Sequence, residues 1–202
     1  LEKSAKENET LKAELTCRIR ENLKIFSDLL KFQADYVKDP ANLEYLKVMR
    51  SRVDTMAMIQ EKLYGSEDLT QIDFELFLNS LVNQLYDTYD VSPARISAYV
   101  NVKNINLPID KAISASLMIN ELISHSMLHS FPIKKKGNIT IEMMEEASGK
   151  YFISVRDNGI GVISHKGRPS SFSMVLVGMY VKNLNGTFSV DRKNGTKVEI
   201  RF

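Results

Sequence analysis

The sequence predicts an α+β chain in which an antiparallel helical hairpin precedes an α/β sandwich with a mixed sheet. Three observations lead to this prediction. Apolar residues recur at steps of three or four over residues 1–64, as they do in long amphipathic helices. After Gly65 the pattern changes to short alternating segments, which are typical of strands. Helical segments lie between these strands, and such mixing is typical of helices packed on one face of a sheet.

The first helix is expected to cover residues 1–37 and to be apolar on two faces. One stripe comprises Leu11, Leu15, Ile19, Leu23, Phe26, Leu30, Ala34 and Val37. A second stripe begins further along and comprises Ile25, Leu29, Phe32 and Tyr36. A helix with two apolar faces must be covered on two sides, as it is in a four-helix bundle.

The second helix is expected to begin at Pro40, a favourable first position, and to end near Tyr64. Two helices supply half of a four-helix bundle. A second copy of the chain is the economical completion, so the sequence predicts a homodimer with a dimeric four-helix bundle. The dimerisation domain is expected over residues 1–66 and a second domain over residues 67–202.

The second domain is expected to contain three helices and a sheet. Asp73 is expected to cap a helix that ends near Tyr89, and Asp110 to cap another that reaches Ser130. A third helix is expected over residues 174–184. Strands are expected around Ile72 and over residues 95–102, 138–144, 151–156, 187–191 and 197–201.

Composition excludes several classes of function. The 27 basic and 25 acidic side chains are too evenly balanced for a nucleic-acid footprint. The single cysteine, Cys17, cannot form an intramolecular disulfide or a cysteine metal cluster, which favours a reducing, cytoplasmic location. No apolar run approaches the ~20 residues of a membrane span, so no membrane insertion is expected. Residues 1–11 resemble the middle of a helix, so the chain is expected to be a fragment of a longer protein.

Four segments carry a resemblance to a known family. Residues 14–24, around Cys17-Arg18, resemble the phosphoacceptor helix of sensor histidine kinases with a His-Arg-hydrophobic-Lys-Asn-Asn-Leu-Gln signature, the HisKA_2 and HWE-like group. Residues 51–53 and 57–64 resemble its second helix. Residues 117–132 and 156–161 resemble the N box and G1 box of the Bergerat-type (GHKL) ATP-binding fold, shared with gyrases, Hsp90-type chaperones and MutL. The resemblance implies a dimerisation hairpin followed by a Bergerat-type ATPase-like domain.

Cys17 is the first departure from the family pattern. The resemblance places the phosphate-accepting histidine at this position. An imidazole is nucleophilic near pH 7, whereas a thiol with an ordinary pKa of about 8.5 is mostly protonated. The surrounding polar stripe puts position 17 on the exposed side of the helix, so the placement of a phosphoacceptor survives without its chemistry. A small, unreactive helix residue is the simplest interpretation of Cys17.

The N box is the second departure. Its usual form is Asn-Glu-Leu, two variable residues and Asn-Ala, and Glu121 matches the glutamate that orients or deprotonates a nucleophile. His125 stands where the family has the asparagine that binds Mg²⁺, and imidazole is a poor ligand for this hard ion. His129 matches the family. For His125, the alternative to a ligand position is a structural or surface histidine. No metal site is therefore expected.

The glycine boxes depart unequally. Asp157, Gly159 and Gly161 match the G1 box, in which the aspartate accepts a hydrogen bond from the adenine amino group and the glycines let the backbone approach the base. A hairpin turn is the structural alternative, because Asn-Gly is itself a turn signal. In the second box, Ser171 and Ser173 lie in the segment that matches a Gly-Leu-Gly-Leu run, whose backbone cradles phosphates.

These departures predict a degenerate histidine kinase, a pseudokinase that acts as a dimeric scaffold for a response-regulator receiver domain or a histidine kinase. No cofactor is expected beyond weak, magnesium-independent binding of ATP or adenosine. Two alternatives stay open. Glu121 and Asp157 favour a divergent ATP-dependent protein-histidine kinase. A histidine-phosphotransfer-like protein would need an acceptor on the bundle, and His125, His129 and His165 all lie outside it.

Overall fold

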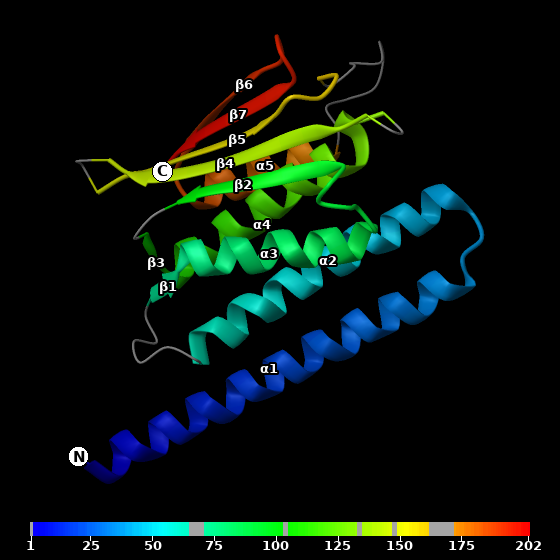
Figure 1. Cartoon of the computed structure of the whole chain (residues 1–202). Helices are drawn as coiled ribbons and strands as arrows, with labels where there is room; N and C mark the ends of the chain where they lie inside the picture. The colour runs from blue at the N-terminus through cyan, green and yellow to red at the C-terminus, as the bar shows by residue number, and fades with distance from the viewer. Residues whose placement is uncertain (1, 65–70, 103–104, 133–134, 147–148, 162–171) are drawn as a thin grey trace. The chain divides into compact units, whose positions relative to one another are not determined.

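The computed structural model describes residues 2–64, 71–102, 105–132, 135–146, 149–161 and 172–202. The chain divides into two compact units, Leu1–Leu69 and Thr70–Phe202. The first is helical and the second combines helices with strands (Figure 1). This confirms the predicted α+β fold class.

The first unit is a hairpin of two long antiparallel helices. Helix α1 covers Glu2–Tyr36 and α2 covers Pro40–Tyr64, within one residue of the predicted helices (Figure 1). Pro40 takes the first position of α2, as expected, where its missing N–H costs nothing. Asp39 precedes it, and its backbone carbonyl accepts a hydrogen bond of 3.0 Å from the N–H of Leu43.

A polar contact joins the two helices of the hairpin. The Ser27 hydroxyl of α1 donates to Oδ1 of Asp54 on α2. The other oxygen of Asp54 lies 3.4 Å from Nε of Arg50, one turn earlier on α2. Sliding either helix would separate Ser27 from Asp54, and a buried polar group without its partner is costly. This contact therefore fixes the register of the hairpin.

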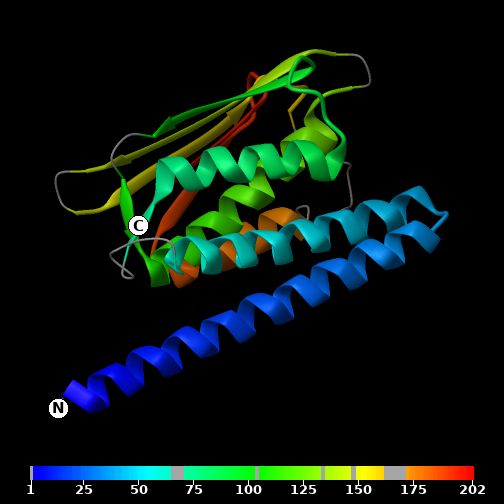
Figure 2. The same cartoon turned by 60° about the horizontal axis from the view of Figure 1, so that its bottom comes forward.

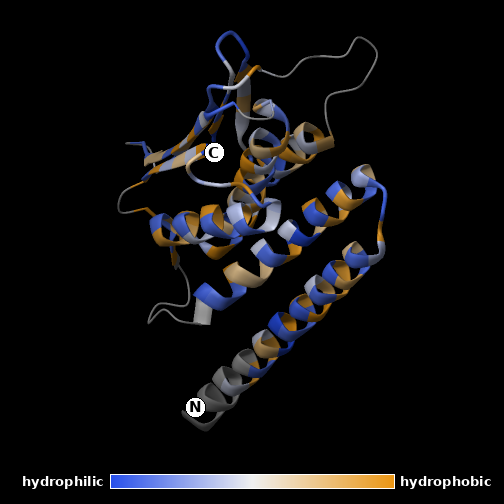
Figure 3. Ribbon diagram, turned by 45° about the vertical axis from the view of Figure 1, so that its right-hand side comes forward, coloured by the Kyte–Doolittle hydropathy of each residue, from blue (hydrophilic) through white to orange (hydrophobic). Residues whose placement is uncertain are grey.

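Much of the apolar surface of α1 is exposed. The second predicted stripe is exposed along its whole length, and Phe26, predicted to belong to the first stripe, is 59% exposed as well. Figure 3 shows apolar segments in orange recurring along α1. Among the described residues, none of the helices combines the length and hydrophobicity of a membrane span. The exposed large apolar side chains of α1 are Leu11, Leu15, Ile19, Ile25, Phe26, Leu29, Phe32 and Tyr36.

The second unit contains a mixed five-stranded sheet in the order β2-β4-β5-β7-β6. Strands β2 and β4 run parallel, and every other neighbouring pair is antiparallel. A separate pair, β1 and β3, is antiparallel. Strand β3 was not predicted, because three residues are too few to show an alternating pattern. The strands cover Gln71–Asp73 (β1), Ile96–Val102 (β2), Asn106–Pro108 (β3), Gly137–Glu145 (β4), Tyr151–Asp157 (β5), Thr187–Asp191 (β6) and Thr196–Arg201 (β7).

Three helices cover one face of this sheet (Figures 1 and 2). They are α3 (Phe74–Tyr89), α4 (Ile109–His125) and α5 (Phe172–Asn183). The side chains of Met118 and Ile119 on α4 are fully buried, as are Ile139 on β4 and Ile153 on β5. Burying one such side chain contributes about 1.5–3 kcal/mol, so the core between α4 and the sheet holds the unit together.

The two predicted helix caps had different outcomes. Asp73 caps α3 as predicted, since its Oδ1 accepts a hydrogen bond of 3.1 Å from the N–H of Leu76. The prediction that Asp110 caps α4 was wrong. Strand β3 runs directly into α4, so the cap position falls on Pro108, which makes no side-chain cap bond. Asp110 lies in the first turn, where its charge still favours the helix dipole.

The end of α4 changes helix type. The sequence predicted one helix reaching Ser130, but the α-helix ends at His125 and Ser126–Ser130 form a π-helix. A π-helix has i→i+5 hydrogen bonds and a wider turn, and such turns are frequent at functional sites. The N box therefore ends in a wide turn.

Candidate nucleotide site and phosphoacceptor position

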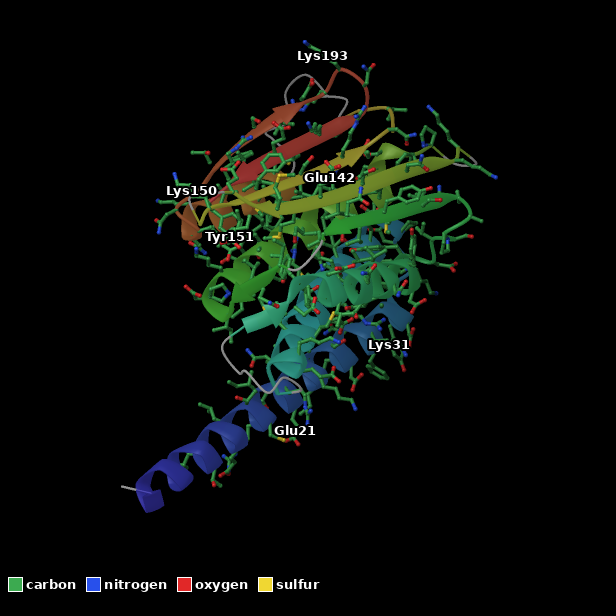
Figure 4. The ribbon with its side chains drawn as sticks, turned by 60° about the vertical axis from the view of Figure 1, so that its left-hand side comes forward. Glu21, Lys31, Glu142, Lys150, Tyr151 and Lys193 are labelled. Atoms are coloured by element: carbon green, nitrogen blue, oxygen red, sulfur yellow. The ribbon has the colours of Figure 1, made fainter. Side chains whose placement is uncertain are left out.

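Position 17 lies on the polar side of α1. Cys17 is half-buried, and its thiol donates to Oε1 of Glu21 at 3.6 Å. Arg20 Nη2 lies 3.8 Å from the sulfur. Figure 4 labels Glu21 on α1, four residues after the thiol. A thiol in this setting is within reach of solvent, but it offers no imidazole nitrogen.

Asp157 is the most heavily hydrogen-bonded residue of the G1 box. Its side chain, at the end of β5, is 1% exposed. Oδ2 accepts one hydrogen bond from the hydroxyl of Ser126 and one from the hydroxyl of Ser130, both of 2.9 Å. Oδ1 accepts from the N–H of Gly159 at 2.9 Å and from the N–H of Thr196 at 3.2 Å. A carboxylate has about four acceptor positions, so the protein fills all of them.

The glycines around Asp157 allow backbones to meet. A Cβ on Gly159 would overlap the carbonyl oxygen of Ser130. The same oxygen accepts a hydrogen bond of 2.9 Å from the N–H of Ile160. Gly161 has φ +72°, and Gly195, whose added Cβ would overlap the Asp157 carbonyl oxygen, has φ +86°. In this chain the glycines are therefore needed for the packing of the G1 turn against the π-helix and the β6–β7 turn.

Glu121 and Asn120 of the N box are both 1% exposed on α4. Asn120 takes part in a buried polar chain: Tyr89 donates to the hydroxyl of Ser124 at 3.0 Å, and Ser124 donates to Oδ1 of Asn120 at 3.1 Å. The chain ties α3 to α4. Glu121, the next residue of α4, lines the same cavity as Asp157.

His125 and His129 lie together at the end of the N box. Their ring centroids are 5.0 Å apart in an edge-to-face arrangement. His125 is half-buried and His129 is exposed. Burial lowers the pKa of His125 below its ordinary value of 6.5, and His129 and Arg192 act in the same direction against the attraction of Asp157. His125 is therefore held in its neutral form.

A cavity of about 20 Å³ lies where the family would place a nucleotide. That volume holds about one water molecule. Thr196 Oγ1, which borders it, is buried and has no hydrogen-bond partner within the described part of the chain. The residues that line the cavity are Glu121, Leu122, His125, Ser126, Val155, Asp157, Ser173, Met174, Val190, Arg192, Thr196 and Val198.

These residues do not fit Mg·ATP. The carboxylate expected to receive adenine already has four donors, and the cavity is far smaller than a purine ring. His125 offers a nitrogen where Mg²⁺ prefers an oxygen. Ser173 borders the cavity at a position where the family has a glycine without a side chain. Ser171, the other serine of the altered glycine box, lies outside the described residues, as does the segment 162–170 between the two boxes.

Comparison with known proteins identifies the relatives of the chain. Residues 14–89 match the HisKA_2 family of histidine kinases. The sensor histidine kinase PdtaS of Mycobacterium tuberculosis (strain H37Rv) is 26% identical over 164 residues, which cover 80% of this chain and 30% of that protein. The chain is homologous to this sensor histidine kinase, and the HisKA_2 match covers residues 14–89. PdtaS of Mycolicibacterium smegmatis is also 26% identical over 164 residues, and the chain covers 31% of it. The homologue thus spans about 30% of the length of these relatives.

Solved structures share the fold of this histidine kinase homologue. The histidine kinase domain of the Erythrobacter litoralis EL346 blue-light activated histidine kinase has a TM-score of 0.67 at 16% identity, with 89% of this chain and 95% of that chain covered. The longer EL346 structure has a TM-score of 0.70 at 15% identity, with 94% and 58% covered. The chain therefore shares the fold of histidine kinase domains.

The sequence indicated most of the candidate residues but missed the donors. Glu121, His125 and Asp157 border one cavity. Gly159 and Gly161 lie in the adjoining turn, His129 lies on the exposed side of the π-helix, and Cys17 belongs to the other unit. Sequence reasoning did not single out Ser126 and Ser130. A signal was present for the first, because Ser126 stands where the N box usually has alanine.

Proposed function

We propose that this histidine kinase homologue is a pseudokinase, a dimeric scaffold of two-component signalling that binds a receiver domain or a histidine kinase without transferring phosphate. The observation that carries the proposal is the saturated carboxylate of Asp157. Its four acceptor positions are filled by Ser126, Ser130 and two backbone N–H groups. An adenine amino group would have to displace one of these donors.

The phosphate half of the site supports the same proposal. Mg·ATP needs an oxygen ligand near position 125 and close backbone approach near positions 171 and 173. His125 supplies an imidazole held neutral by burial, and Ser173 supplies a side chain. Each lost charge-assisted contact to a phosphate weakens binding by about 1.5–3 kcal/mol. Two such losses would weaken a micromolar site by about a hundredfold or more.

Cys17 stands where a kinase of this family has the histidine that accepts the phosphoryl group. A kinase of this family needs an imidazole there, and Cys17 has a thiol instead. The polar side chains around it are nevertheless present and exposed: Glu14 pairs with Arg18 at 2.6 Å, and Glu21 and Lys24 follow. A receiver domain or a kinase that recognises the surface around a phosphoacceptor would still meet a charged helix face.

The exposed apolar face of α1 supports the proposed dimerisation. Ile25, Leu29, Phe32 and Tyr36 are all more than half exposed in the single chain. Contiguous apolar surface of this kind is typical of protein interfaces. A second copy would place two α1 and two α2 helices in one bundle, with the same apolar surface buried on both chains.

A divergent kinase is the second candidate, and Glu121 favours it. This buried carboxylate borders the cavity beside Asp157, as a residue that acts on a nucleophile would. A phosphotransfer protein ranks third. His125 and His129 lie on α4 and the π-helix rather than on the hairpin, and His165 lies outside the described residues.

Incubation with radiolabelled Mg·ATP tests the proposal. We expect no acid-labile, base-stable label on the unmodified chain. The Cys17→His variant restores the imidazole and should also stay unlabelled, because the nucleotide site is still filled. A catalytically competent HisKA_2 kinase serves as the positive control for the assay. Stoichiometric label on either protein would contradict the pseudokinase and favour the divergent kinase.

A further inference from the structure

We propose that the hydroxyls of Ser126 and Ser130 act as built-in substitutes for the adenine amino group and are the residues that exclude adenine nucleotides from this site. The inference deepens the proposed function, on which it rests. It identifies which side chains close the pocket, and it implies that their removal restores affinity for adenine compounds.

The hydrogen-bond pattern divides the carboxylate into two halves. Oδ1 receives the backbone N–H groups of Gly159 and Thr196, which belong to the turn itself and cannot be removed by a side-chain change. From the described residues, Oδ2 receives only the two serine hydroxyls, at 2.9 Å each. An external donor can therefore reach Asp157 only at Oδ2, and only if a serine gives way.

The spacing of the two serines explains why two hydroxyls reach one oxygen. Ser126 and Ser130 are the first and last residues of the π-helix. Side chains four residues apart lie on the same face of a helical segment, so both hydroxyls point toward Asp157. Both side chains are buried, at 5% and 2% exposure, so neither hydroxyl can turn to solvent instead.

The serine hydroxyls and the adenine amino group are both hydrogen-bond donors. An adenine amino group donates N–H to a carboxylate, and a serine hydroxyl donates O–H to the same acceptor. The serines are covalently attached and already ordered, so they pay no entropy of association, while a free nucleoside does. The N box of the family usually has alanine at position 126, which offers no donor. With serine at position 126, the carboxylate of Asp157 accepts a hydrogen bond from the protein itself where it would otherwise be available to a nucleotide.

Ser173 and Met174 of α5 also border the cavity and would have to move to admit a purine. That cost is the same in the unmodified chain and in a serine variant. The difference in affinity between the two proteins therefore measures the hydroxyls alone.

The experiment is a calorimetric titration of the full chain with adenosine and with ATP, without Mg²⁺. The proteins are the unmodified chain, Ser126→Ala, and Ser126→Ala combined with Ser130→Ala. We expect the double variant to bind adenosine at least about tenfold more tightly than the unmodified chain, because one hydrogen bond to a charged group corresponds to about this factor. Ser126→Ala alone should gain at least about threefold and keeps the test available if the double variant does not fold.

Ser124→Ala is the matched control. Its hydroxyl is equally buried on the preceding turn, but it bonds Asn120 and Tyr89 rather than Asp157. This variant should bind adenosine no better than the unmodified chain. Adding Asp157→Asn to the double variant should abolish the gain in adenosine affinity. If the serines had only a structural role, the gain would not depend on Asp157.

The outcomes separate the inference from the function on which it rests. A folded double variant, or a folded Ser126→Ala, that gains no affinity overturns the inference and leaves the pseudokinase standing. An equal gain in Ser124→Ala overturns it as well, because loosening of α4 would then be the cause. Tight adenosine or ATP binding by the unmodified chain overturns both.

Discussion

Gly159 and Ser130 are in such close contact that a Cβ on the glycine would overlap the serine's carbonyl oxygen. The same oxygen accepts a hydrogen bond of 2.9 Å from Ile160, the residue after the glycine. The G1 turn is thereby fastened to the last residue of the π-helix. The family motif associates Gly159 with a nucleotide, but in this chain the close packing against Ser130 is enough to require a glycine.

Gly159→Ala should destabilise the second unit. The added methyl group meets backbone rather than a flexible side chain, and overpacking of this kind costs about 1–3 kcal/mol. Urea unfolding followed by circular dichroism measures the change. Gly178→Ala in α5 is the matched control. A Cβ on Gly178 would meet only a ring atom of Phe188, at a distance of 3.8 Å. This control should be neutral or stabilise by up to about 1 kcal/mol. Equal stability of Gly159→Ala and the unmodified chain would contradict the close contact.

Leu29→Glu should dissociate the dimer while the hairpin stays folded. Leu29 is 53% exposed in the single chain, so the substitution is tolerated there but places a charge in the proposed interface. An unpaired buried polar group costs about 1–3 kcal/mol, and a symmetric dimer has two copies, so Kd should rise at least about 30-fold. Sedimentation velocity at micromolar concentration measures this.

Lys31→Glu is the control for the dimer. Lys31 is exposed on the same helix two residues later, is labelled in Figure 4, and already carries a charge. This variant should sediment like the unmodified chain. A monomeric unmodified chain with an intact hairpin would refute the four-helix bundle.

The stability of the second unit should fall at acidic pH because of His125. Burial lowers its pKa from 6.5 in the folded state, so at pH values between the two pKa values the unfolded chain binds more protons. Stability therefore rises with pH in this window. The contribution of neutral His125 is complete above about pH 6.5 and is lost as the pH falls through the folded pKa.

Urea midpoints between about pH 7.5 and pH 5 measure this effect. His125→Gln should flatten the decline below about pH 6.5. His129→Gln should reduce it without removing it, because His129 is only the second cause of the lowered pKa. An identical decline in the His125→Gln variant would assign the acid sensitivity to other groups.

The helical hairpin could be predicted closely because its signals are local. The repeating apolar positions and Pro40 placed both helices within one residue of their observed ends. The exposure of Phe26 could not be predicted in the same way. A helix with two apolar stripes gives no local sign of which stripe packs against the neighbouring helix. The exposure of Phe26 depends on packing between α1 and α2.

The candidate site was predictable only in part. Asp157, Glu121 and His125 were identified by their places in the motifs, and all three border one cavity. The donors to Asp157 were not foreseen, because Ser126 and Ser130 lie 31 and 27 residues before it and meet it only through tertiary packing. An uninterrupted helix to Ser130 was expected, and neither periodicity nor propensity indicates where an α-helix widens. Asp110 failed as a cap for a related reason, since β3 was too short to be expected before α4.

Titration of the unmodified chain with ATP, in the presence and absence of Mg²⁺, tests the central claim most directly. That claim is that the family's nucleotide site is filled by the protein's own donors. We expect no saturable heat at micromolar ATP and no effect of Mg²⁺, because His125 offers no oxygen ligand and Asp157 has no acceptor position left. Micromolar, magnesium-dependent binding that is lost in Asp157→Ala would contradict the account.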